Sequence, residues 1–168
     1  MKKVIDAFDY AGVICKAMPK GILLTTKAND KVNTMTIGWG TMGIEWGRPV
    51  FVAYVRGSRH THQMIENSGE FTVNIPIGDF DSKILGFCGT KSGRDLDKIQ
   101  QLGLTLVEPL NIATPGIKEL PLTLECKVLY RVEQTLDTMP QNILDRYYPN
   151  GDHHYAYYAE IVGAYIAE

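Results

Sequence analysis

The sequence feature that most limits how this chain can fold is a continuous apolar run that ends in a basic, hydroxyl-rich segment. Residues 50–55, Val-Phe-Val-Ala-Tyr-Val, have the pattern of a fully buried strand. Residues 56–62, Arg-Gly-Ser-Arg-His-Thr-His, read as the start of a helix, and residues 70–76 have the pattern of a strand that follows it. Hydroxyl and backbone N–H groups at a helix N-terminus, with guanidinium groups nearby, suit a phosphate dianion. The segment therefore predicts a phosphate pocket beside a sheet.

The other patterns predict one β-rich α+β domain over residues 1–168. Further strands are expected at 21–27, 32–39, 104–110, 121–134 and 155–166. Short helices are expected at 6–18, 79–88, 92–102 and 140–148. The glycine-rich stretch 40–49 is expected to be a loop. With no linker or internal repeat, these elements favour a barrel with short helices at its ends.

Composition and charge exclude several classes of protein. The 168 residues suit one domain, and the net charge of -2 argues against a nucleic-acid binder, which usually carries a basic excess. No apolar run reaches the ~18 residues of a membrane span. The three cysteines, Cys15, Cys88 and Cys126, are widely spaced and form no CxxC pair, so a reducing cytoplasm is expected. Asp6 and Asp9 interrupt the first segment, and no signal peptide is expected.

Four segments together resemble the flavin reductase-like family, which includes flavoredoxins and the flavin reductase components of two-component monooxygenases. These segments are 33–39, 58–61, 65–76 and 88–98, and the similarity spans roughly residues 10–130. The resemblance implies a split β-barrel that binds FMN and has short flanking helices. It also implies a homodimer with FMN near the subunit interface, and hydride transfer from NADH or NADPH through the flavin.

The candidate flavin ligands come from these segments. Residues 58–61 supply phosphate ligands, and residues 35–39 are expected to run along the isoalloxazine ring, where backbone N–H and C=O groups can satisfy its polar edge. The candidates are Met35, Thr36, Ile37, Gly38, Trp39, Arg56, Ser58, Arg59, Thr61, Asn74, Ser92, Gly93 and Lys98. For Asn74 and Lys98 a purely structural role is an equal alternative. For the phosphate ligands the alternative is an ordinary helix N-terminus with a solvated arginine.

The four histidines do not have the spacing of a metal site. His60 and His62 alternate on the first turn of a helix and do not share a face, and no cysteine or carboxylate stands beside them at ligand spacing. No metal is expected. Either His153 or His154 is a candidate for the rim of the flavin site, and we take His154 as the candidate nicotinamide contact. No catalytic triad is legible, as expected where the cofactor carries the chemistry.

Two functions fit such a site. One is an NAD(P)H-dependent flavin oxidoreductase. The alternative is a flavoredoxin-like electron carrier that keeps its FMN and passes electrons to a redox partner protein. A flavin-binding module without turnover is a third candidate. The first two require the same FMN pocket, so the sequence does not separate them, whereas oxidation of NADH or NADPH by the purified protein does.

Overall fold

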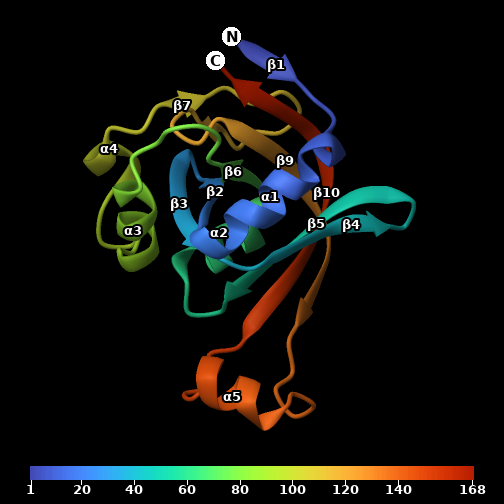
Figure 1. Ribbon diagram of the computed structural model, residues 1–168. Coiled ribbons are helices and arrows are strands. Elements are labelled where there is room, and N and C mark those ends of the chain that lie inside the picture. The colour runs from blue at the N-terminus through green and yellow to red at the C-terminus, as the bar shows by residue number, and fades with distance from the viewer.

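The computed structural model describes residues 1–168 and is built on an eight-stranded antiparallel sheet (Figure 1). Its strands are β1 Lys2–Val4, β2 Ile22–Ala28, β3 Lys31–Ile37, β4 Gly40–Glu45, β5 Arg48–Arg56, β6 Glu70–Ile75, β9 Leu122–Glu133 and β10 His154–Ala167. The order is β3-β2-β6-β9-β10-β5-β4, with β1 also paired to β10. Because the end strands β3 and β4 do not pair, the curled sheet stays open. The expected split β-barrel, mainly β with short helices, is confirmed.

The continuous apolar run of β5 is explained by burial on both of its faces. Phe51, Ala53 and Val55 point into the main core inside the barrel. Val50 and Val52 belong to a smaller apolar cluster on the opposite face, with residues of β10. Alternation between polar and apolar residues is lost where both faces of a strand are covered.

Five short α-helices accompany the sheet. They are α1 Ala11–Ala17, α2 His60–Ser68, α3 Lys83–Thr90, α4 Lys98–Leu102 and α5 Gln141–Tyr147. Helix α2 ends at Gly69, whose φ of 68° lies in the left-handed region that glycine adopts without strain. Helix α5 lies away from the barrel, at the tip of the long β9–β10 ribbon (Figure 1). No helix is long and apolar enough to cross a membrane.

Three expectations about local structure are wrong in detail. Residues 40–49, expected as a loop, contain β4, which pairs with β5. A side chain at Gly40 would place Cβ 2.7 Å from the Phe51 ring, so glycine lets the two strands approach there. The expected helix at 92–102 is helical only from Lys98, and the expected strand at 104–110 is reduced to β7, Leu106–Val107, which pairs with β8, Gly116–Ile117.

Candidate functional site

Three adjoining cavities run from α2 past the end of β3 to the α5 arm, which we define as residues 134–152. The polar cavity has a volume of about 320 Å³, the middle cavity about 190 Å³ and the apolar chamber about 620 Å³. The polar and middle cavities share Met35, Arg56 and Arg59. The middle cavity and the apolar chamber share Gly38, Trp39 and Tyr54. The three therefore form one site whose polarity changes along its length.

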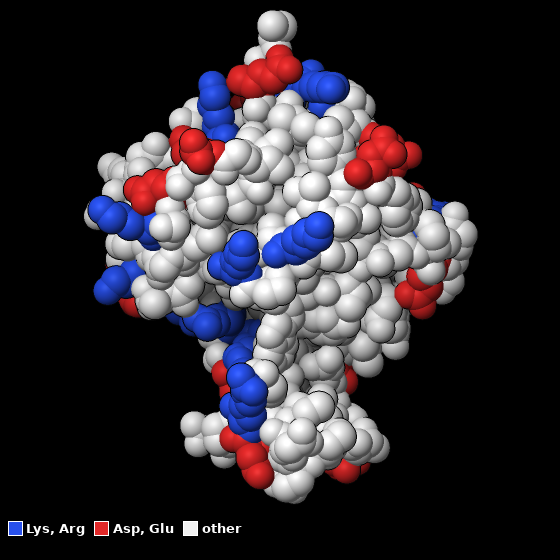
Figure 2. All heavy atoms as spheres, in the orientation of Figure 1, with Lys and Arg blue, Asp and Glu red and all other residues white.

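The polar cavity carries a large excess of positive charge. The cationic side chains that line it are Arg56, Arg59, Lys91, Arg94 and Lys98. Asp152 is the one carboxylate in the lining. Lys and Arg spheres also gather on the neck between the barrel and the lobe that contains α5 (Figure 2). Guanidinium and ammonium groups gathered in this way suit a phosphate group.

The wall of the polar cavity is closely packed around Gly93. A Cβ atom at Gly93 would lie 2.2 Å from Oδ1 of Asn33, so only glycine lets this loop approach β3. The Asn33 amide in turn donates to the Thr61 hydroxyl at 3.1 Å. Beside them, the buried Nδ1 of His60 has no hydrogen-bond partner within the protein. Burial, followed by the positive charge of Arg94, lowers the pKa of His60.

Lys98 is a buried cation at the floor of the polar cavity, with 4% of its surface exposed. Its ammonium group donates to the backbone carbonyls of Thr34 at 2.9 Å and Cys88 at 3.0 Å. Burial is the main cause that lowers the pKa of Lys98. A buried cation held by carbonyl dipoles is poorly compensated, and a dianion in the cavity would supply the missing charge.

Two predicted phosphate ligands are engaged with the end of the α5 arm. The Arg56 guanidinium donates to the carbonyl oxygens of Asp152 at 2.6 Å and Tyr147 at 2.8 Å. The Ser58 hydroxyl donates to Oδ2 of Asp152 at 2.8 Å. Arg56 thus fastens the arm to the barrel. Arg59 is exposed and lines both the polar and middle cavities.

Five of the nine residues that line the middle cavity are residues 35–39, the end of β3 and the two residues after it. The Thr36 hydroxyl donates to the Leu85 carbonyl at 2.6 Å, which anchors β3 to α3. The Trp39 ring stands edge-on to Tyr147, with ring centroids 5.1 Å apart, and lies 4.8 Å from His154. Residues 35–39 therefore line the cavity together with the aromatic side chains of Tyr54 and His154.

His154 is a buried, neutral histidine at the edge of the middle cavity. Its Nδ1 lies 2.8 Å from the Tyr148 hydroxyl. Burial, followed by the charge of Arg56, lowers the pKa of His154 from 6.5 to about 4. In the unfolded chain the group binds its proton more readily, so His154 makes the fold less stable as the pH falls from 6.5 towards 4. Above that range the imidazole stays uncharged.

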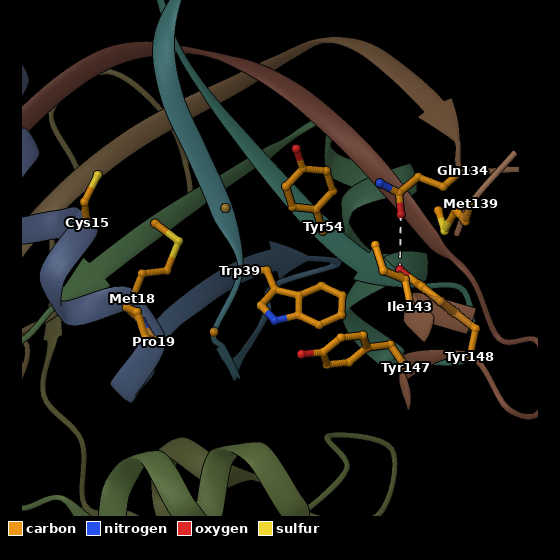
Figure 3. Close-up of a pocket in the computed structure, with 12 residues that line it drawn as sticks. Cys15, Met18, Pro19, Trp39, Tyr54, Gln134, Met139, Ile143, Tyr147 and Tyr148 are labelled. Atoms are coloured by element: carbon orange, nitrogen blue, oxygen red, sulfur yellow. Dashed lines mark hydrogen bonds between the residues drawn. The ribbon is translucent and has the colours of Figure 1, made fainter. Parts of the chain in front are cut away.

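The apolar chamber lies between α1 and the α5 arm (Figure 3). Its lining residues are Cys15, Met18, Pro19, Gly38, Trp39, Gly40, Tyr54, Gln134, Met139, Ile143, Tyr147 and Tyr148. They come from four segments far apart in the sequence. No single motif marks the chamber, and only Gly38 and Trp39 among these residues are predicted ligands.

Twelve of the thirteen candidate ligands line the polar or middle cavity, and Asn74 does not. Asn74 is fully buried in the core, where its Oδ1 accepts from the Thr25 hydroxyl at 2.8 Å and its Nδ2 donates to the Thr123 hydroxyl at 3.2 Å. The Asn74 side chain therefore has the structural role that was the alternative to binding the flavin. Sequence reasoning missed Lys91 and Arg94, although both lie in the same motif as Ser92 and Gly93.

Comparisons with known proteins agree with this architecture. Residues 16–168 match the family model described as flavin reductase like domain. An uncharacterized protein of Archaeoglobus fulgidus is 34% identical over 115 residues, which cover 68% of this chain and 64% of that protein. The chain thus matches less than two thirds of this curated relative's length.

Two solved structures have a similar fold. Flavoredoxin from Methanosarcina acetivorans superposes with a TM-score of 0.68 and 26% identity over 88% of this chain and 68% of that chain. The FMN-binding domain of a flavin reductases-like enzyme from Shewanella baltica superposes with a TM-score of 0.67 and 18% identity over 99% of this chain and 77% of that chain. The family model covers nearly all of the sequence and the fold agrees with it, so this chain belongs to the flavin reductase-like family.

Proposed function

We propose that this protein binds FMN and acts as an NAD(P)H-dependent flavin oxidoreductase. The observation that carries the proposal is the polar cavity, rich in cations, joined to a middle cavity walled by the end of β3. The similarity to an FMN-binding flavin reductases-like enzyme supports FMN as the ligand. When bound, FMN supplies the capacity to take a hydride from a nicotinamide and pass two electrons on.

The residues of the polar and middle cavities fit the parts of FMN. Arg59 and the hydroxyls of Ser58 and Thr61 would bind the phosphate, with Lys98 behind them and the orphaned Nδ1 of His60 as a further partner. The backbone of residues 35–39 would bind the polar edge of the ring. The pattern of charge suits one phosphate group at one end and an uncharged ring at the other.

We expect the protein to purify yellow and to release FMN rather than FAD. The site has one cation-rich cavity, and the sequence has no glycine fingerprint for a diphosphate. Chromatography of the cofactor released by denaturation measures its identity. If FAD predominates, or if no flavin binds after reconstitution, the proposal is wrong.

Similarity to a flavoredoxin favours the electron carrier as the second candidate function. Oxidation of NADH or NADPH, followed at the nicotinamide absorbance band with and without free flavin, separates the two. Rapid oxidation supports the oxidoreductase. FMN that stays oxidised until a reduced partner protein is added supports the carrier.

We expect His154→Ala to raise the KM for the nicotinamide about five-fold and to leave the FMN content unchanged. His154 lies at the edge of the middle cavity beside Trp39, and one lost contact is worth about 1 kcal/mol. Because its pKa is about 4, this contribution stays constant between pH 5.5 and 8. Steady-state kinetics at several pH values measure both effects.

His153→Ala is the matched control, because His153 pairs with Glu133 outside these cavities. Its KM for the nicotinamide is expected to equal that of the wild type. Loss of FMN from the His154→Ala variant would instead place His154 among the cofactor ligands.

We infer a homodimer from an exposed aromatic patch on the outer face of the sheet, defined by Trp46, Tyr130 and Tyr158. Trp46 and Tyr130 are 53% and 49% exposed, and the three rings lie within 6.3 Å of one another. Such a patch usually marks an interface, and a symmetric dimer would bury it twice. Met42, from the same segment of the chain, packs against the core instead.

We expect Trp46→Glu to convert the dimer to a monomer at micromolar concentration, because it removes the ring that contacts both Tyr130 and Tyr158 and places a charge in the contact. Val4→Glu is the control, since Val4 is 68% exposed and lies outside the patch. Sedimentation velocity measures the oligomeric state. A wild-type protein that sediments as a monomer refutes this interface.

We also propose a cytoplasmic location. The three cysteines are free, and two of them, Cys88 and Cys126, are buried. Burial raises the pKa of the Cys88 thiol to about 11, so the thiol stays protonated. Unpaired thiols of this kind support a reducing compartment.

A further inference from the structure

The apolar chamber contains no charged side chain. None of its twelve lining residues is an aspartate, glutamate, lysine, arginine or histidine, and eight are hydrophobic. The polar cavity at the other end of the site has five cations. A charged ligand group would lose its hydration in the chamber without gaining a partner, so the chamber favours a neutral ligand.

The chamber offers flat aromatic surfaces and a few hydrogen-bond donors. Four of its residues are aromatic, namely Trp39, Tyr54, Tyr147 and Tyr148. Figure 3 shows Trp39 and Tyr147 side by side, and the Tyr148 hydroxyl donates to Oε1 of Gln134 at 3.4 Å. That bond uses the oxygen of Gln134 and leaves its NH₂ group to donate. The lining therefore suits a planar, conjugated molecule with carbonyl oxygens.

The position of the chamber places such a ligand next to the proposed ring site. Gly38, Trp39 and Tyr54 line both the chamber and the middle cavity. The volume of about 620 Å³ falls within the range of small-molecule sites and exceeds what ordinary packing defects leave. Met139 and Ile143 of the α5 arm line the chamber on its outer side (Figure 3).

We propose that the apolar chamber is the electron-acceptor site and that the acceptor is a neutral, planar molecule of the quinone class. The proposal rests on the proposed function for its source of electrons. In the net reaction, NAD(P)H, a quinone and one proton from water give NAD(P)⁺ and a hydroquinone. The nicotinamide loses a hydride, and the quinone gains two electrons and two protons. The diphosphate of the nicotinamide donor finds no cation in the chamber and stays on the side of Arg56 and Arg59.

Binding of tetramethyl-1,4-benzoquinone, measured by equilibrium dialysis, tests the proposal. All four ring carbons of this quinone that could accept a thiol carry methyl groups, so the exposed Cys15 thiol in the chamber wall does not add to it. The experiment uses the protein as purified, after its FMN content has been measured. We expect one equivalent to bind, and Ile143→Glu to weaken binding at least ten-fold, because it places a charge in the chamber wall. Val4→Glu, at a remote exposed position, is expected to bind as the wild type does.

The outcomes separate this proposal from the proposed function. If FMN is present but the quinone does not bind, or if both variants bind it equally, the acceptor site is wrong and the flavin site stands. A chamber filled by a second copy of the chain would also prevent quinone binding and would overturn the proposal. If the quinone binds as expected to a protein that takes up no FMN, the chamber binds planar conjugated ligands but the proposed function fails.

Discussion

Arg59→Ala is expected to weaken FMN binding about 10- to 150-fold and to leave the fold unchanged. A hydrogen bond from a guanidinium group to a phosphate is worth about 1.5–3 kcal/mol, which corresponds to this range of affinity. Arg59 is exposed at the junction of the polar and middle cavities, so its removal leaves no hole in the core. Titration of the flavin-free protein with FMN, followed by flavin fluorescence, measures the loss.

Arg48→Ala is the matched control, because Arg48 is an exposed arginine that pairs with Glu160 at 2.6 Å and lines none of the three cavities. We expect its affinity for FMN to equal that of the wild type. Arg56→Ala is a different case, since it releases the carbonyls of Tyr147 and Asp152 and so loosens the α5 arm. Equal, small losses for Arg59→Ala and Arg56→Ala would mean that the phosphate binds elsewhere.

The parts of the site that the sequence predicts are those encoded by adjacent residues. Residues 58–61 begin a helix directly after a buried strand, and residues 35–39 are the end of β3 and the two residues after it. Each pattern carries its own chemistry, so each can be identified without knowledge of the sheet order. Twelve of the thirteen candidates accordingly line the polar or middle cavity.

The parts that the sequence does not predict depend on strand order and on burial. Tyr54 and Ile143 meet in the chamber because β10 pairs with both β5 and β9 and so brings the α5 arm over β5. The prediction of Asn74 as a flavin ligand is not supported, for a different reason. A polar residue in a strand can bind a ligand or satisfy buried hydroxyls, and the threonines that surround Asn74 come from β2 and β9, which the local sequence does not reveal.

The contacts of Asp152 connect the phosphate end of the site to the chamber. Its carboxylate accepts from Ser58, a predicted phosphate ligand, while its backbone carbonyl is bound by Arg56. A phosphate that takes the Ser58 hydroxyl would compete with this carboxylate. The loop that contains Asp152 follows α5, which carries Ile143 and Tyr147 in the chamber wall. Phosphate binding in the polar cavity is therefore expected to change the position of α5 in the chamber wall, and the position of α5 is expected to affect phosphate binding.

Lys98→Met is expected to reduce the affinity for FMN about 10- to 100-fold. The free energy of unfolding of the flavin-free protein is expected to change by no more than about 1 kcal/mol. Methionine nearly matches the length of lysine and fills the same buried space. The variant loses two hydrogen bonds to the carbonyls of Thr34 and Cys88. It also escapes the cost of burying a cation, a cost already visible in the lowered pKa of Lys98. These two changes oppose each other in the flavin-free protein.

With FMN bound, the two changes no longer cancel, because the phosphate would then lie in the cavity that the Lys98 ammonium lines. The variant should therefore lose most of the rise in Tm that FMN gives to the wild type, since a ligand stabilises the fold in proportion to its affinity. Lys91→Met is the control, as Lys91 lines the same cavity but is exposed, and its screened charge should matter less. Thermal unfolding with and without FMN measures both quantities. A flavin-free Lys98→Met protein that is about 3 kcal/mol less stable, yet binds FMN normally, would assign Lys98 to the fold rather than to the phosphate site.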